Sequence, residues 1–60
     1  MSQNFDDLAA LVETTRGDVE KAEGGNKAAC TRVRKSMQTL KNYAQEIRKE
    51  MLEARDAGAN

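Results

Sequence analysis

Basic side chains recur at every seventh residue along the second half of the chain. The five that form this basic stripe are Lys27, Arg34, Lys41, Arg48 and Arg55. Residues seven apart lie on one side of an α-helix, so the five charges form a line with about 10.5 Å between neighbours. Such a line displaces the counterions of a polyanion, and each guanidinium can bind phosphate with two hydrogen bonds. The spacing therefore indicates a surface for nucleic acid that contacts the phosphate backbone without reading base sequence.

The same stripe also has a structural interpretation. Basic residues beside a helix–helix seam often pair with acids of the neighbouring helix, and Glu13, Asp18 and Glu20 are available in the first half of the chain. The two interpretations can hold together at different residues, so the sequence leaves both open.

Charge is distributed unevenly, although the formal net charge is zero. Residues 1–23 hold six acids and two bases, whereas residues 27–49 hold seven bases and one acid, Glu46. This asymmetry favours an anionic partner. It equally fits a hairpin in which the acidic half neutralises the basic half.

Other kinds of chemistry have little support in the residues. His is absent, and a helix pair offers no obvious concave site for acid–base catalysis. We therefore expect no enzyme activity, no cofactor and no small-molecule substrate. Glu46, Glu50 and Glu53 are spaced like metal ligands, but without His they are better interpreted as a solvated helix face, so no metal site is expected.

Cys30 is the single cysteine of the chain. It excludes an internal disulfide and suits a reducing compartment, and we expect it to pack as a small apolar residue. No apolar run approaches the roughly 20 residues of a membrane span, and no secretory signal opens the sequence. These observations predict a cytoplasmic protein without a membrane partner.

Two helices must position the charges. Apolar residues spaced three and four apart over residues 4–23, and again over residues 27–57, predict α-helices. Residues 24–26, Gly-Gly-Asn, predict a turn, because Gly accepts left-handed backbone and Asn can cap the next helix. The predicted fold is all-α, an antiparallel two-helix hairpin that makes one domain over residues 1–60. Asn4 is the expected N-cap of the first helix, and Gly17 is a weak point inside it.

Each predicted helix carries an apolar seam. In the first helix the seam residues are Phe5, Leu8, Val12, Thr15, Val19 and Ala22. In the second they are Cys30, Val33, Met37, Leu40, Ala44, Ile47, Met51 and Ala54, which are positions a and d of a heptad with Cys30 at a. The basic stripe then occupies position e.

The hairpin is expected to assemble with further copies. The second helix is longer by about ten residues, so Met51 and Leu52 have no cover within the chain. Two helices also leave one flank of each seam open, which favours a homodimer that forms a four-helix bundle. The expected interface residues are Phe5, Leu8, Val12, Val33, Met37, Leu40, Ile47 and Met51.

One continuous run resembles a known family. Residues 25–35, Gly-Asn-Lys-Ala-Ala-Cys-Thr-Arg-Val-Arg-Lys, resemble the signature of the bacterial linker-histone-like proteins of the chlamydial developmental type. Cys30 stands where that family usually has a smaller residue. Residues 43–50 resemble the family's next block, which ends in Arg-Lys-Glu. The resemblance extends over about residues 20–55.

The resemblance implies a histone-like nucleoid protein that binds double-stranded DNA without sequence preference and compacts it. By position, the implied contacts are Lys27, Arg32, Arg34, Lys35, Arg48 and Lys49, to which the basic stripe adds Lys41. Longer members carry a Lys/Ala-rich tail that these residues do not contain, so the resemblance implies a short member with modest, salt-sensitive affinity. The alternative is a dimeric helical module that binds a protein or RNA loops, with Met51 and Leu52 as the contact for a protein partner.

Overall fold

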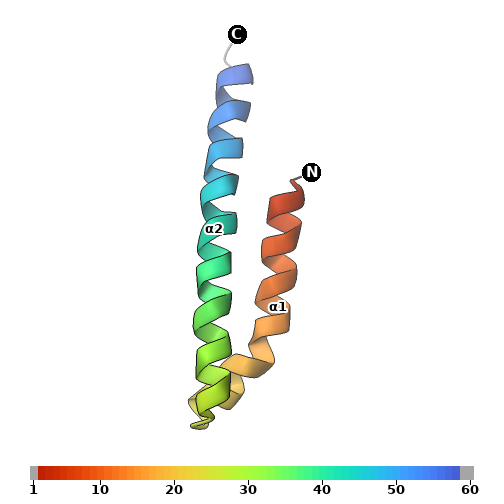
Figure 1. Ribbon diagram of the computed structural model, residues 1–60. Coiled ribbons are helices and arrows are strands. Elements are labelled where there is room, and N and C mark those ends of the chain that lie inside the picture. The colour runs from red at the N-terminus through yellow and green to blue at the C-terminus, as the bar shows by residue number, and fades with distance from the viewer. Residues whose placement is uncertain (1, 59–60) are drawn as a thin grey trace.

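Two α-helices joined by a short turn make up the described part of the chain (Figure 1). The computed structural model describes residues 2–58, so Met1, Ala59 and Asn60 of the expected domain 1–60 lie outside the described residues. α1 spans Gln3–Glu23 and continues through Gly17 without a break, and α2 spans Lys27–Gly58. The helices pack antiparallel, which confirms the all-α hairpin predicted from the apolar spacing.

The turn has the backbone that its glycine and asparagine residues favour. Gly25 has a φ of 98°, in the left-handed region that side chains disfavour. The Oδ1 atom of Asn26 accepts a hydrogen bond of 2.9 Å from the amide of Ala29, so Asn26 caps α2 as expected. The amide of Gly24 donates to the carbonyl of Glu20 and closes the end of α1.

The start of α1 differs from the prediction. Ser2 is the N-cap, because its Oγ accepts a hydrogen bond of 3.1 Å from the amide of Phe5, so the prediction of Asn4 as the cap is wrong. Asn4 instead donates from Nδ2 to the carboxylate of Glu50 at 2.9 Å, and the Ser2 hydroxyl donates to the other oxygen of that carboxylate at 2.5 Å. Glu50 therefore ties the start of α1 to α2.

The seam on α2 consists of heptad rows d and g, whereas rows a and d were predicted. The side chains turned toward α1 occupy positions d and g: Ala29, Val33, Ser36, Leu40, Tyr43, Ile47 and Glu50, of which Ala29 is buried and the others half-buried. Row a is exposed, so Cys30, Met37 and Ala44 do not pack between the helices as predicted, and Met51, for which no cover within the chain was expected, is exposed as well. Alanine and serine at g let the two backbones approach, whereas methionine at a would hold them apart.

The seam on α1 shifts in the same direction. Its buried or half-buried residues from Leu8 onward are Leu8, Leu11, Thr15, Asp18, Val19 and Ala22. Phe5 and Val12 are exposed, contrary to their predicted place in the seam. The Thr15 hydroxyl, the most buried polar group of the described residues, donates to the Leu11 carbonyl at 2.6 Å and so keeps a partner inside the seam.

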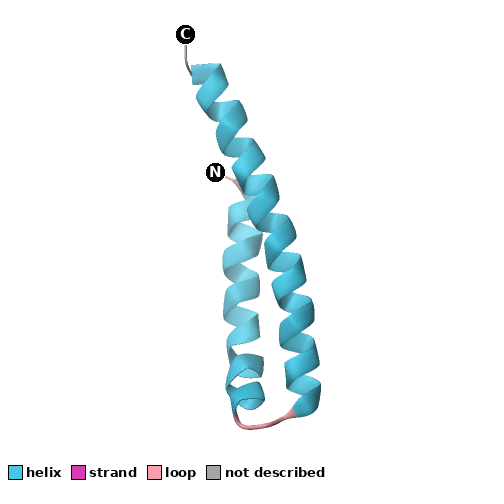
Figure 2. Cartoon of the chain, turned by 90° about the vertical axis from the view of Figure 1, so that its left-hand side faces the viewer, coloured by secondary structure: helices cyan, strands magenta, loops and turns pink. Residues whose placement is uncertain are grey.

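The hairpin is long and thin, with extents of 53 × 16 × 13 Å. Among residues 2–58, Ala29 and Thr15 alone are buried, so no large apolar side chain is enclosed. α2 continues well past the start of α1, as Figure 2 shows, and Met51 and Leu52 on this extension are about half exposed. The predicted absence of cover for these two residues within the chain is therefore confirmed.

Candidate nucleic-acid interface

The side of α2 that points away from α1 carries heptad positions b, e and f, because d and g face α1. Its neutral residues at b are Thr31, Gln38, Gln45 and Leu52. Its basic residues, all exposed, are Lys27, Arg34, Lys35, Lys41, Arg48, Lys49 and Arg55. Between Lys27 and Arg55 no acid occupies these three positions. We call this side the basic outer face.

Four cations in the central part of the basic outer face have no acidic neighbour one helical turn away: Arg34, Lys35, Lys41 and Arg48. Within residues 2–58 none of the four forms an ion pair. The Nζ atom of Lys49 lies 3.9 Å from Oε2 of Glu46, and Nε of Arg55 lies 3.5 Å from Oδ1 of Asp56. Both ion pairs are exposed to solvent and therefore weak. The central part of the face thus carries positive charge that the hairpin itself leaves available.

Arg32 has a different role from the other cations. It occupies position c, on the flank of α2, and donates from Nε to Oδ1 of Asp18 on α1 at 3.0 Å, while its Nη2 lies 3.0 Å from the same oxygen in an ion pair. The hydrogen bond from Arg32 holds the pKa of the Asp18 carboxyl below its ordinary value of 3.8, and the same bond raises the pKa of Arg32. Pairing with an acid of α1 therefore occurs at Arg32, which lies outside the basic stripe and which the resemblance had implied as a DNA contact.

None of the three acids considered as partners for the basic stripe reaches it among residues 2–58, since Asp18 pairs with Arg32 at position c. Glu13 pairs with Arg16 of its own helix at 2.8 Å, and that hydrogen bond raises the pKa of Arg16. Glu20 forms no ion pair among residues 2–58. The sequence pattern gave no sign of the Glu50 contacts with Ser2 and Asn4, since they join residues more than forty positions apart.

The Gly-Asn-Lys-Ala-Ala run at the start of α2 determines the side of the helix on which the following basic residues lie. Asn26 fixes the first turn of α2, and Ala29 is fully buried against α1, so the rotation of α2 about its axis is determined there. Arg32 and Arg34, two positions apart, consequently point to different sides of the helix. One faces Asp18 and the other lies on the basic outer face.

Neither a metal centre nor a membrane span is formed by the described residues. Between residues 2 and 58 no three His, Cys, Asp or Glu side chains gather as metal ligands, and Glu50 is occupied by Ser2 and Asn4. Neither α1 nor α2 combines the length and apolar character that a bilayer crossing requires.

The comparison with known families covers nearly all of the hairpin. The sequence pattern described as histone H1-like protein Hc1 matches residues 2–57, from the N-cap of α1 to the last turn of α2. The chain belongs to this Hc1 family. No curated protein and no solved structure matches the chain. The match includes α1, so the unit characteristic of the Hc1 family in this chain is the whole hairpin and not the turn with its basic residues alone.

The residues expected at an oligomer interface fall into two groups in this Hc1-family hairpin. Leu8, Val33, Leu40 and Ile47 are half-buried between α1 and α2 and belong to the seam within the chain. The other four are exposed: Phe5, Val12, Met37 and Met51. Contacts between copies therefore remain a prediction, and the second group is the part of the set available for them.

Proposed function

We propose that this Hc1-family hairpin is a histone-like nucleoid protein that binds double-stranded DNA, without sequence preference, through the basic outer face of α2. The observation that carries the proposal is the charge of that face, where exposed cations follow one another from Lys27 to Arg55 with no acid among them. Membership of a histone H1-like family supports the same conclusion.

The chemistry of the face suits the phosphate backbone. Its cations extend over about 42 Å of helix, from the rise per residue, and lysine and arginine there release condensed counterions from DNA. The proposed contacts are Lys27, Arg34, Lys35, Lys41, Arg48 and Lys49. Arg32 is a secondary contact, because it would have to exchange its bond with Asp18 for a phosphate. The face carries no aromatic side chain on which a base could stack.

We also propose that the chain assembles as a homodimer that forms a four-helix bundle. A hairpin without an enclosed core leaves Phe5, Val12, Met37 and Met51 exposed, and a second hairpin would remove these side chains from water. The DNA-binding part of the proposal does not require the dimer, because the basic outer face is complete within one chain.

The test of DNA binding neutralises two cations in the centre of the face. We expect Lys35→Gln with Arg48→Gln to weaken binding about equally for unrelated duplexes and to reduce the salt dependence of binding by about two phosphate contacts. Fluorescence anisotropy at several salt concentrations measures both quantities, and circular dichroism checks that helicity is retained.

A matched control removes the same amount of charge from the other helix. Arg16→Gln with Lys21→Gln takes two cations from α1, away from the basic outer face, and is expected to leave the salt dependence unchanged. Equal effects of the two double variants would indicate a general influence of net charge and would contradict the proposed interface. Native affinity in both would show that DNA does not contact Lys35 and Arg48, and absence of binding by the native protein at low salt would leave the protein-interaction module as the better interpretation.

A further inference from the structure

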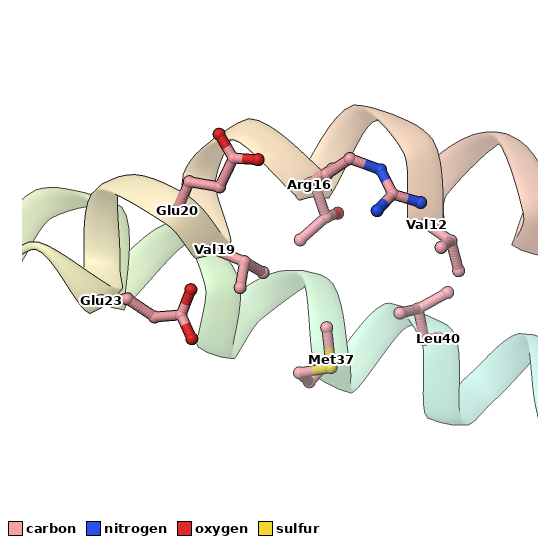
Figure 3. Close-up of a pocket in the computed structure, with 8 residues that line it drawn as sticks. Val12, Arg16, Val19, Glu20, Glu23, Met37 and Leu40 are labelled. Atoms are coloured by element: carbon pink, nitrogen blue, oxygen red, sulfur yellow. The ribbon is translucent and has the colours of Figure 1, made fainter.

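One face of the hairpin is apolar and uncovered by the described chain. Here the two helices leave a groove of about 360 Å³, shown in Figure 3, where Val12 and Val19 of α1 lie opposite Met37 and Leu40 of α2. Row a of α2 continues this face, from exposed Cys30 near the turn to exposed Met51. We call it the open face.

The exposed area of the chain is larger than its mass accounts for. The accessible surface is 4793 Å² for 6.6 kDa, whereas a compact folded chain of this mass exposes about 3,900 Å². The excess of roughly 900 Å² is close to the 800 Å² or so that each partner buries in a standard protein interface. A second hairpin is thus large enough to cover what the first leaves exposed.

Each helix carries two adjacent rows of apolar residues. One row packs on the other helix of the chain, and the second lies on the open face, where it can contact another helix. On α2, row d packs on α1 together with row g, and the row a residues Cys30, Met37 and Met51 lie on the other side of row d. On α1, Leu8 and Leu11 face α2, while Phe5 and Val12 lie beside them on the open face. Each helix of a four-helix bundle contacts two others through adjacent rows of this kind.

The two edges of the open face have opposite charge. Along the α1 edge lie Glu20 and Glu23, visible in Figure 3, together with Glu13, whose partner Arg16 is on the same edge. Along the α2 edge lie the e-row cations, of which Arg34 and Lys41 have no acidic partner among residues 2–58. Two copies can therefore match charge when the α1 edge of one meets the α2 edge of the other.

The relative direction of the two copies decides whether these edges match. If both turns lie at the same end, α1 of each copy faces α2 of the other, and acidic edges meet basic ones. If the turns lie at opposite ends, each α2 faces the other α2, and basic rows repel across the interface. The Asp18–Arg32 pair shows which residues of α1 and α2 lie at the same position along the hairpin axis. From this alignment, the position of Glu20 along the axis falls between those of Lys27 and Arg34.

We propose that a second copy of the chain docks on the open face with its turn at the same end, so that α1 of each copy packs against α2 of the other. The proposal rests on the dimer proposed above and does not require DNA, although the two surfaces share the e row of α2. It places the two α2 helices diagonally in the bundle, with their basic outer faces pointing in opposite directions. A dimer of this form carries one DNA surface on each side.

A distance between labels near the two turns tests the arrangement without DNA. The variant Ala28→Cys with Cys30→Ser offers one thiol on the exposed outer side of α2, away from the open face. In the same-end dimer, two spin labels at position 28 are separated by the width of the bundle, about 20–25 Å from the helix diameter. In an opposite-end dimer centred on the paired part of α2, which ends at Glu50, they are about 32–35 Å apart along the axis, and the separation across the bundle adds to this.

Charge reversal tests the edge contacts in the same DNA-free solution. We expect Glu20→Lys alone and Arg34→Glu alone each to raise the dimer dissociation constant by about three- to tenfold, and the two together to restore it. Sedimentation equilibrium measures these constants. A monomeric mass at high micromolar concentration would overturn the dimer itself. A long label distance, or no recovery in the double variant, would overturn the same-end arrangement while leaving the dimer and the proposed DNA interface standing.

Discussion

Arg32 and Arg34, two residues apart in α2, have different roles in this hairpin. Arg32 bonds to Asp18 and joins the helices, whereas Arg34 has no ion-pair partner among residues 2–58 and lies on the basic outer face. Their chemistry is the same, and their difference comes from two steps of rotation along α2. Position on the helix therefore separates a structural cation from one available to DNA.

The Asp18–Arg32 pair predicts a dependence of stability on pH. The folded-state pKa of Asp18 is lowered, so the stability from this pair is fully present above the ordinary pKa of 3.8 and is lost as pH falls through the lowered value. We expect Asp18→Asn to have a lower melting temperature than the native protein near pH 6. The difference should shrink as pH falls through that lowered value, because the protonated Asp18 carboxyl and the amide that replaces it are both uncharged.

Thermal melts of the two proteins at several pH values measure this effect. Glu13→Gln is a suitable comparison, because Glu13 pairs with Arg16 on the same exposed helix surface and does not join the helices. A difference between native protein and Asp18→Asn that persists unchanged as pH falls through that lowered value would show that the aspartate acts through something other than its charge.

Several residue roles could be predicted from local sequence, and others could not. Asn26 as a cap follows from its place after two glycines, and the free cations follow from the absence of acids one turn away. The choice between Ser2 and Asn4 as the N-cap could not be made from local sequence, because both residue types cap helices well, and Asn4 bonds instead to Glu50 of the other helix. A contact between residues so far apart leaves no trace in short-range spacing.

At the scale of the helix, both helices form where apolar spacing predicts them. The side of each helix that faces the other differs from the predicted side. The row containing Val33, Leu40 and Ile47 belongs to the predicted seam and to the observed one. The sequence cannot choose between rows a and g on either side of it, since both contain residues that pack. Close approach at Ala29 decides in favour of row g.

Two glycines predict opposite effects on helix stability. Gly17 lies inside α1 with nothing within 4 Å of an added Cβ, so Gly17→Ala is expected to raise the free energy of unfolding by about 0.5–1 kcal/mol. Gly25 has a φ of 98°, so Gly25→Ala is expected to lower it by about 1–2 kcal/mol. Urea denaturation followed by circular dichroism measures both. Destabilisation by Gly17→Ala would mean that α1 needs a flexible point there.

At the scale of the whole molecule, the proposed DNA contacts and the proposed dimer contacts lie on adjacent sides of the hairpin, which share the e row of α2. The basic outer face of α2 points away from α1, and the open face lies between the helices. The long second helix and its exposed Met51 and Leu52 were predictable from helix lengths alone. Which apolar rows remain open was not, because it follows from the packing of one helix on the other.

The salt dependence of DNA binding by the native protein tests the central claim most directly. We expect similar affinities for unrelated duplexes of equal length, and a slope of log affinity against log salt of about −4 to −5 for four to six neutralised phosphates on each chain. Anisotropy titrations over a series of salt concentrations give both quantities. A strong preference for one duplex, or no binding at low salt, would contradict a DNA interface built from the basic outer face.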